Sequence, residues 1–94
     1  MISITQMKYL TYIEDYASID EASDALFKTS TAVAFSIRSL ERKLGNKLFT
    51  STRTKQSDFS PRKYKHVVRP TKYGEKVIRV CRNVLKEVEK IKDL

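Results

Sequence analysis

The side chains best suited to chemistry lie on one face of residues 30–44. Apolar residues repeat there at helical spacing, at Val33, Ile37, Leu40 and Leu44, which predicts a helix with one buried stripe. The opposite face, found by turning about 100° per residue, is mostly polar. We take it, with the start of the helix, as a candidate DNA contact: Thr29, Ser30, Thr31, Ala34, Phe35, Arg38 and Arg42.

These residue types suit the edges of base pairs. Arginine donates paired hydrogen bonds to guanine or to phosphate, small hydroxyls serve either, and apolar atoms contact the thymine methyl group. Backbone N–H groups at Thr29-Ser30 can also face a phosphate. The alternative is an ordinary solvated helix face with a cap. Phe35 argues against it, because a large ring opposite the core lacks an apolar partner, although single exposed aromatics are common.

A second candidate surface is the basic stretch at residues 50–70, where the helical period vanishes. It holds six basic side chains against Asp58 alone, and Val67-Val68 is its only β-branched apolar pair. We predict a wing of two short strands joined by a long loop through Ser60-Pro61. Such a wing would neutralise phosphates, so that affinity falls steeply with salt; the alternative is a solubilising loop. The candidate contacts are Arg53, Lys55, Arg62, Lys63, Lys65 and Arg69, with His66 beside them.

Other kinds of chemistry find little support in the sequence. The single histidine and the single cysteine, Cys81, offer almost nothing for a metal site or an internal disulfide. No glycine-rich phosphate loop is present, and His66 has no evident nucleophile partner. The sequence therefore predicts no enzyme, no cofactor and no metal.

The remaining elements position these surfaces. Ser3 with Gln6 and Ser18 with Glu21 are capping-box patterns, which predict a helix at about 4–16 and a short one after residue 18. Thr29 caps the third helix, and Gly45 suits its end. The tight connection between the second and third helices is typical of a helix-turn-helix.

The last predicted helix, at about 72–92 and capped by Thr71, carries two apolar lines. Ile78 and Leu85 form the second of these lines. One line can pack on the domain itself, which leaves the other for a partner helix. We therefore expect a homodimer with an antiparallel helix pair and a roughly palindromic site; the alternative is that the whole stripe packs on its own domain. The candidate dimerisation residues are Tyr73, Val77, Val80, Cys81, Val84, Val88 and Ile91.

The whole chain of 94 residues fits one mainly α unit with a small β wing. We divide it into a winged helix-turn-helix at 1–70 and a dimerisation helix at 71–94. The net charge of +8 arises wholly from residues 51–94, because residues 1–50 carry equal numbers of basic and acidic side chains. No segment suits a membrane span or a signal peptide, so we expect a cytoplasmic, nucleoid-associated protein.

Several motifs carry a resemblance to one family. They are Met7-Lys8-Tyr9-Leu10, Ser18-Ile19-Asp20-Glu21-Ala22-Ser23-Asp24-Ala25-Leu26, Ile37-Arg38-Ser39-Leu40-Glu41, Leu44-Gly45-Asn46-Lys47-Leu48-Phe49 and Arg69-Pro70-Thr71-Lys72-Tyr73-Gly74-Glu75. With these, the chain resembles the N-terminal DNA-binding domain of LysR-type transcriptional regulators. The resemblance implies a recognition helix in the major groove, a wing on the flanking backbone or minor groove, and a linker helix that pairs with its copy.

The chain also departs from the family pattern. Thr29-Ser30-Thr31 stands where members usually have Ser-Gln-Pro, and Ala34-Phe35 stands where they have Ser-Arg. The polar set that reads bases is thinner, so the family's sequence preference does not carry over. The wing is longer and more basic, and the effector-binding domain of full-length members is not in this sequence. A naturally short regulator and a truncated one both remain open.

These observations predict a homodimeric transcriptional regulator that binds double-stranded DNA. Two alternatives remain. One is an architectural or plasmid-maintenance protein with weak sequence choice. The other is an adaptor or antagonist that pairs with another regulator through the last helix.

Overall fold

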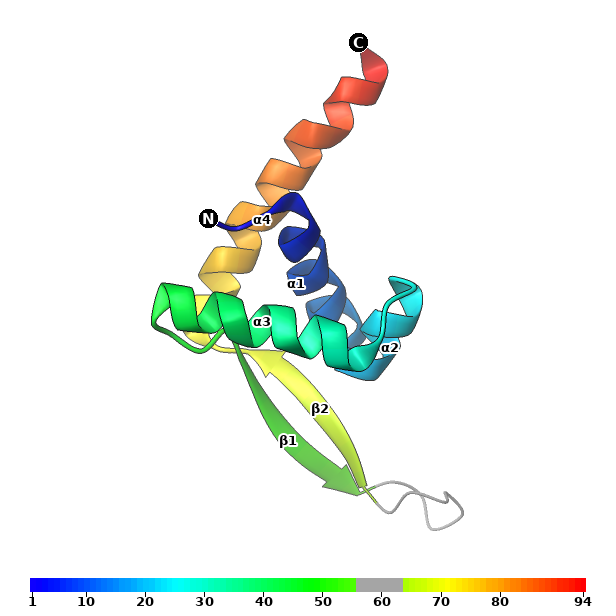
Figure 1. The fold of residues 1–94 in the computed structure, drawn as a ribbon, viewed down its shortest axis with the longest axis vertical. Coiled ribbons are helices and arrows are strands. Elements are labelled where there is room, and N and C mark those ends of the chain that lie inside the picture. Colours follow the sequence, from blue (N-terminus) through cyan, green and yellow to red (C-terminus); the bar gives the residue numbers. More distant parts are fainter. Residues whose placement is uncertain (56–63) are drawn as a thin grey trace.

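The computed structural model describes the backbone of residues 1–55 and 64–94, and the side chains of 1–52 and 67–94. Three helices precede a two-stranded antiparallel sheet, and a long helix follows it (Figure 1). The elements are α1 (Ile4–Tyr16), α2 (Ile19–Ala25), α3 (Ser30–Leu44), β1 (Phe49–Lys55), β2 (Tyr64–Pro70), α4 (Lys72–Glu89) and a final 3-10 turn (Lys90–Asp93). The predicted mainly α fold with a small β wing is confirmed.

Each of the four α-helices begins at a hydroxyl residue that the sequence identified. The side chains of Ser3, Ser18, Thr29 and Thr71 each accept a hydrogen bond from a backbone N–H in the first turn of their helix. At Ser3 the capping box is complete, because the Gln6 side chain accepts from the Ser3 N–H in return. These caps satisfy amide groups that have no partner within the helix, and so they fix where each helix starts.

Residues with a left-handed backbone conformation lie in the turns between the first three helices and at the turn from α3 to the wing. Ala17 ends α1 with φ 53°, and Phe27 has φ 57° in the turn before α3. Gly45 ends α3 with φ 73°, the conformation that glycine adopts without steric cost. The chain therefore reverses sharply between α1 and α2 and again between α2 and α3.

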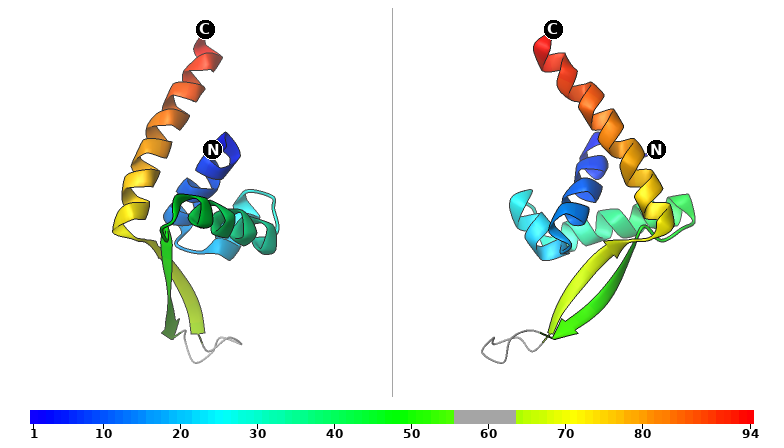
Figure 2. Two further views of the ribbon diagram at one scale, coloured as in Figure 1. Left: turned by 60° about the vertical axis from the view of Figure 1, so that its left-hand side comes forward. Right: turned by 180° about the vertical axis from the view of Figure 1, so that it is seen from behind.

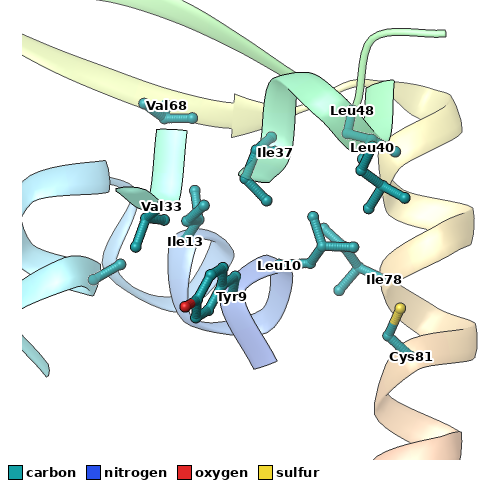
Figure 3. Packing of buried hydrophobic residues seen from close by; sticks show 11 residues of the cluster. Tyr9, Leu10, Ile13, Val33, Ile37, Leu40, Leu48, Val68, Ile78 and Cys81 are labelled. Carbon is teal, nitrogen blue, oxygen red and sulfur yellow. The ribbon is translucent and has the colours of Figure 1, made fainter. Parts of the chain in front are cut away.

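The core lies where α1, α3 and α4 meet beside the root of the wing (Figure 3). Leu10 and Ile13 of α1 are fully buried, as are Val33 of α3 and Leu48 just before β1. One member of the predicted α3 stripe differs: Leu44 is 38% exposed. It is the last residue of the helix, where the chain already turns away at Gly45, so no neighbouring element covers it.

The wing is a two-stranded ribbon that projects away from the helices (Figure 1). Its register pairs Phe49 with Pro70 at the root and Lys55 with Tyr64 at the far end. At the root, Val68 is buried and its N–H donates to the Ala17 carbonyl over 3.0 Å. The predicted strands are confirmed. The predicted loop through Ser60-Pro61 lies outside the described residues.

Helix α4 leaves the body in the direction opposite to the wing (Figure 2). Ile78 and Cys81 bury its first half against the core. The Arg82 guanidinium then donates to Glu14 over 2.6 Å and to Asp15 over 2.8 Å, at the end of α1. The hydrogen bond to Glu14 contributes most to raising the pKa of Arg82. Packing and this ion pair together set the direction of α4. None of the described helices is long and apolar enough to cross a membrane.

The main chain at Leu48 joins α3, the wing and α4. Its N–H donates to the Glu41 carboxylate over 2.7 Å, and its carbonyl accepts from the Thr71 N–H over 3.0 Å. Gly74, in the first turn of α4, packs directly on this carbonyl: an added Cβ would lie 2.0 Å from the oxygen. Only glycine permits this approach.

We predict that Gly74→Ala destabilises the fold by about 1–3 kcal/mol, the usual cost of overpacking. Alanine's better helix propensity, about 1 kcal/mol, offsets only part of the clash, because the obstacle is backbone. Gly45→Ala is the matched control. A Cβ added at Gly45 meets nothing within 4 Å, so the only cost of this substitution comes from the positive φ. In urea denaturation, the free energy of unfolding should be lower for Gly74→Ala than for Gly45→Ala. A Gly74→Ala protein as stable as the wild type would contradict the packing described.

Candidate nucleic-acid interface

Helix α3 has one face in the core and one face in solvent. Its buried residues are Val33, Ile37 and Leu40. The opposite face, called the α3 face below, is exposed at every residue and consists of Thr31, Phe35, Arg38 and Arg42. Thr29 is also exposed, and Ser30 and Ala34 at the edge are half-buried. The structure therefore places the predicted helix residues together on one accessible surface.

The two arginines supply the charge of this face. Within the part of the chain that the structure describes, neither Arg38 nor Arg42 takes part in an ion pair. Glu41, the nearest acid in sequence, turns its carboxylate to the N–H groups of Leu48 and Phe49. Both guanidinium groups are thus free to donate to an external acceptor.

The hydroxyls at the start of α3 are largely used within the fold. Ser30 donates to the Asp20 carboxylate over 2.6 Å, and Thr29 accepts from the Ala32 N–H over 3.1 Å. Thr31 is left as the hydroxyl on the exposed face. The sequence did not indicate the role of Asp20, because this contact joins residues ten positions apart and has no local pattern.

Two phenylalanines in this region are exposed. Phe35 is 63% exposed in the middle of the α3 face, and Phe27 is 95% exposed in the turn before the helix. The sequence singled out Phe35 by its place opposite the core. Nothing in the sequence around Phe27 predicts an exposed aromatic residue with a left-handed backbone conformation.

Few of the predicted wing contacts can be placed in detail. Arg69 is exposed near the root of β2, opposite Thr50 in the register. Arg53 and Lys55 belong to β1, and Lys65 to β2. Arg62 and Lys63 lie outside the described residues. The strands therefore carry basic positions outward from the side of the body opposite to the free end of α4 (Figure 1).

The predicted dimerisation set divides into three groups. Val80, Val88 and Ile91 are 61%, 38% and 65% exposed. Val84 is half-buried, whereas Tyr73 and Val77 pack partly against the domain's own core. Val77, Val80, Val84 and Val88 of α4 form one line with Ile91 of the 3-10 turn that follows, and we call this line the α4 apolar face.

The assignment of Cys81 to the partner face needs correction. Its side chain is 2% exposed and belongs to the core beside Ile78. The physical reason is that α4 packs on the body along Gly74, Ile78 and Cys81, about a quarter-turn from the α4 apolar face. Burial raises the pKa of the Cys81 thiol. Among the described residues no group of three or more acids, histidines or cysteines could hold a metal.

Comparison with known proteins identifies this arrangement. Residues 4–75 match the family described as bacterial regulatory helix-turn-helix protein, lysR family. This match covers α1 to the start of α4, including the α3 face and the wing. A search of curated proteins gave no match.

Solved structures show the same fold. The DNA-binding domain of BenM, in a complex with benA site 1 DNA, is 18% identical with a TM-score of 0.76, over 98% of this chain and 90% of that one. The DNA-binding domain of CbnR, in a complex with DNA, is 17% identical with a TM-score of 0.76, over 98% of this chain and 92% of that one. A full-length OxyR variant from Pseudomonas aeruginosa is 18% identical with a TM-score of 0.76, over 99% of this chain. The present chain spans 28% of that OxyR.

Proposed function

The chain belongs to the LysR family of bacterial regulatory helix-turn-helix proteins, and on that premise we propose that it is a transcriptional regulator that binds double-stranded DNA as a homodimer. The observation that carries the proposal is the α3 face: an exposed helix surface with two arginines that have no ion pair among the described residues, opposite the buried side chains of Val33, Ile37 and Leu40. An α-helix fits the major groove, and arginine is the commonest reader of guanine there.

The wing supplies the second part of the proposed interface. Residues 50–70 contribute six basic side chains, and residues 51–94 carry the entire net charge of +8. With α3 in the major groove, the wing would follow the flanking backbone or minor groove. Its lysines and arginines would then neutralise phosphates and release counterions, which gives affinity without sequence choice.

The α4 apolar face supports the proposed dimer. Val80 is exposed on α4, which extends beyond the body, and Ile91 is exposed in the 3-10 turn that continues it (Figure 2). A line of exposed aliphatic residues is stabilised by burial against another helix. Pairing with a second copy would relate two α3 helices by a two-fold axis and favour a roughly palindromic site. Such a protein would act on the nucleoid, in the cytoplasm.

Two other functions use the same surfaces and differ in measurable ways. An architectural or plasmid-maintenance protein would bind all duplexes with similar affinity. An adaptor or antagonist would pair through the α4 apolar face with another regulator and would not need the α3 face. A regulator binds duplexes selected from a random pool more tightly than scrambled duplexes, whereas an architectural protein binds both alike. An adaptor would keep its function when Arg38 or Arg42 is replaced, whereas a DNA-binding regulator would not.

We predict that Arg38→Ala and Arg42→Ala each weaken binding to a selected duplex by roughly 10- to 100-fold, the range for one arginine–guanine pair. An arginine that contacts phosphate instead lowers the slope of log affinity against log salt by about one. Fluorescence anisotropy at several salt concentrations measures both effects.

Lys86→Ala is the matched control for these variants. Lys86 is exposed on the polar side of α4, so its removal takes away one positive charge without touching either proposed surface. Loss of affinity equal to that of the arginine variants would indicate a general charge effect. Unchanged binding in both arginine variants would place DNA recognition elsewhere.

We predict that Val80→Asp produces a monomer, because a carboxylate in an apolar helix pair would lose its hydration without a partner. The fold itself should remain, since Val80 is already 61% exposed. Asn83→Asp adds the same charge to the polar side of α4, where the side chain is exposed, and should leave the dimer intact. Sedimentation equilibrium distinguishes the two, and a dimeric Val80→Asp protein would count against this interface.

A further inference from the structure

We propose that Phe35 recognises thymine through its C5-methyl group, so that the α3 face reads part of its site by apolar contact rather than by hydrogen bonds. This inference rests on the proposed function, in which α3 occupies the major groove. Thymine is then the base that Phe35, at the centre of the α3 face, selects.

The position of Phe35 supports this role. The ring is 63% exposed at the middle of the α3 face. Thr31 lies one turn before it and Arg38 one turn after it, at spacings that make side chains neighbours on a helix surface. Any duplex that Arg38 reaches would therefore also meet the ring.

The polar groups around Phe35 leave the centre of the surface to apolar atoms. The Ser30 hydroxyl already donates a hydrogen bond to Asp20, and the Thr29 hydroxyl oxygen caps α3. Ala34, beside the ring, adds only a methyl group. The first half of the helix therefore presents Thr31 with Ala34 and Phe35, and the arginines lie in the second half.

The chemistry of the major groove then selects the base. Every base edge there presents hydrogen-bond donors or acceptors, and among them only thymine adds a methyl group. An exposed ring that faced guanine, cytosine or adenine would desolvate polar atoms without replacing their hydrogen bonds. Against thymine it covers an apolar group and is itself covered.

The surrounding charge favours a nucleic acid over a protein as the partner of this ring. Arg38 and Arg42 follow Phe35 along the same face, without ion pairs among the described residues. An apolar protein interface would have to bury these charges, which is costly. A polyanion with methyl groups in its groove accommodates both.

The test compares thymidine with deoxyuridine, which pairs identically but lacks the methyl group. Duplexes selected by the wild-type protein from a random pool are remade with deoxyuridine at single positions. We expect a position in each half-site where the exchange weakens wild-type binding by about fourfold, the factor for one buried methyl group. Phe35→Ala should bind the two forms of that position equally.

Phe27→Ala is the control, because it removes another exposed phenylalanine ring that lies in the turn rather than on the α3 face. It should keep the preference for thymidine. Equal wild-type affinity for both duplexes at every position would overturn the inference, as would a Phe35→Ala protein that still prefers thymidine. Thermal unfolding should be unchanged in Phe35→Ala, since the ring is largely in solvent.

Failure of the proposed function has a different signature. In that case selected and scrambled duplexes bind alike, or neither binds. The whole random pool, prepared once with thymidine and once with deoxyuridine, then gives the answer: equal affinity for the two pools overturns the role of Phe35. A thymidine preference that Phe35→Ala removes supports it even where sequence choice is weak.

Discussion

The main chain of Leu48 is the constraint on which the arrangement of the molecule depends. Its N–H is held by Glu41 of α3, its carbonyl is held by Thr71 at the start of α4, and its side chain is fully buried. The carbonyl also lies against Gly74, where no side chain fits. One residue thus ties the end of α3, the root of the wing and the start of α4. In the proposed complex, the base-reading helix, the phosphate-binding ribbon and the dimer helix would move as one body.

Much of this arrangement could be predicted from the sequence, because it rests on short-range patterns. Helix starts follow from hydroxyl caps such as Ser3 and Thr29, whose partners lie within the next turn. The buried stripe follows from helical spacing at Val33, Ile37 and Leu40. Composition also separated the wing from the helices, since its basic, apolar-poor stretch has no helical period.

The features that the sequence did not indicate arise from contacts between distant segments. Cys81 belongs to an arc of apolar residues on α4, and periodicity alone cannot tell which of them face the core and which face a partner. The direction of α4 decides this. It depends on the packing of Gly74 against the Leu48 carbonyl and on the ion pairs of Arg82 with the end of α1. Likewise, the contact of Ser30 with Asp20 depends on how α2 crosses the start of α3.

The unequal distribution of charge bears on how affinity and specificity would be divided. One acidic side chain of α2, Asp20, lies at the start of α3, as its contact with Ser30 shows, whereas the arginines lie in the second half of α3. The start of α3 is thus a poor place for strong phosphate contacts, and attraction to the backbone would come mainly from the wing and from Arg38 and Arg42. Backbone contacts position a protein without selecting sequence. Selectivity in the proposed complex would then depend on few atoms: two guanidinium groups, one hydroxyl and the ring of Phe35. In such a complex the arginines that reach guanine would contribute most of the discrimination, and the contact of Phe35 with a thymine methyl group would add a smaller share.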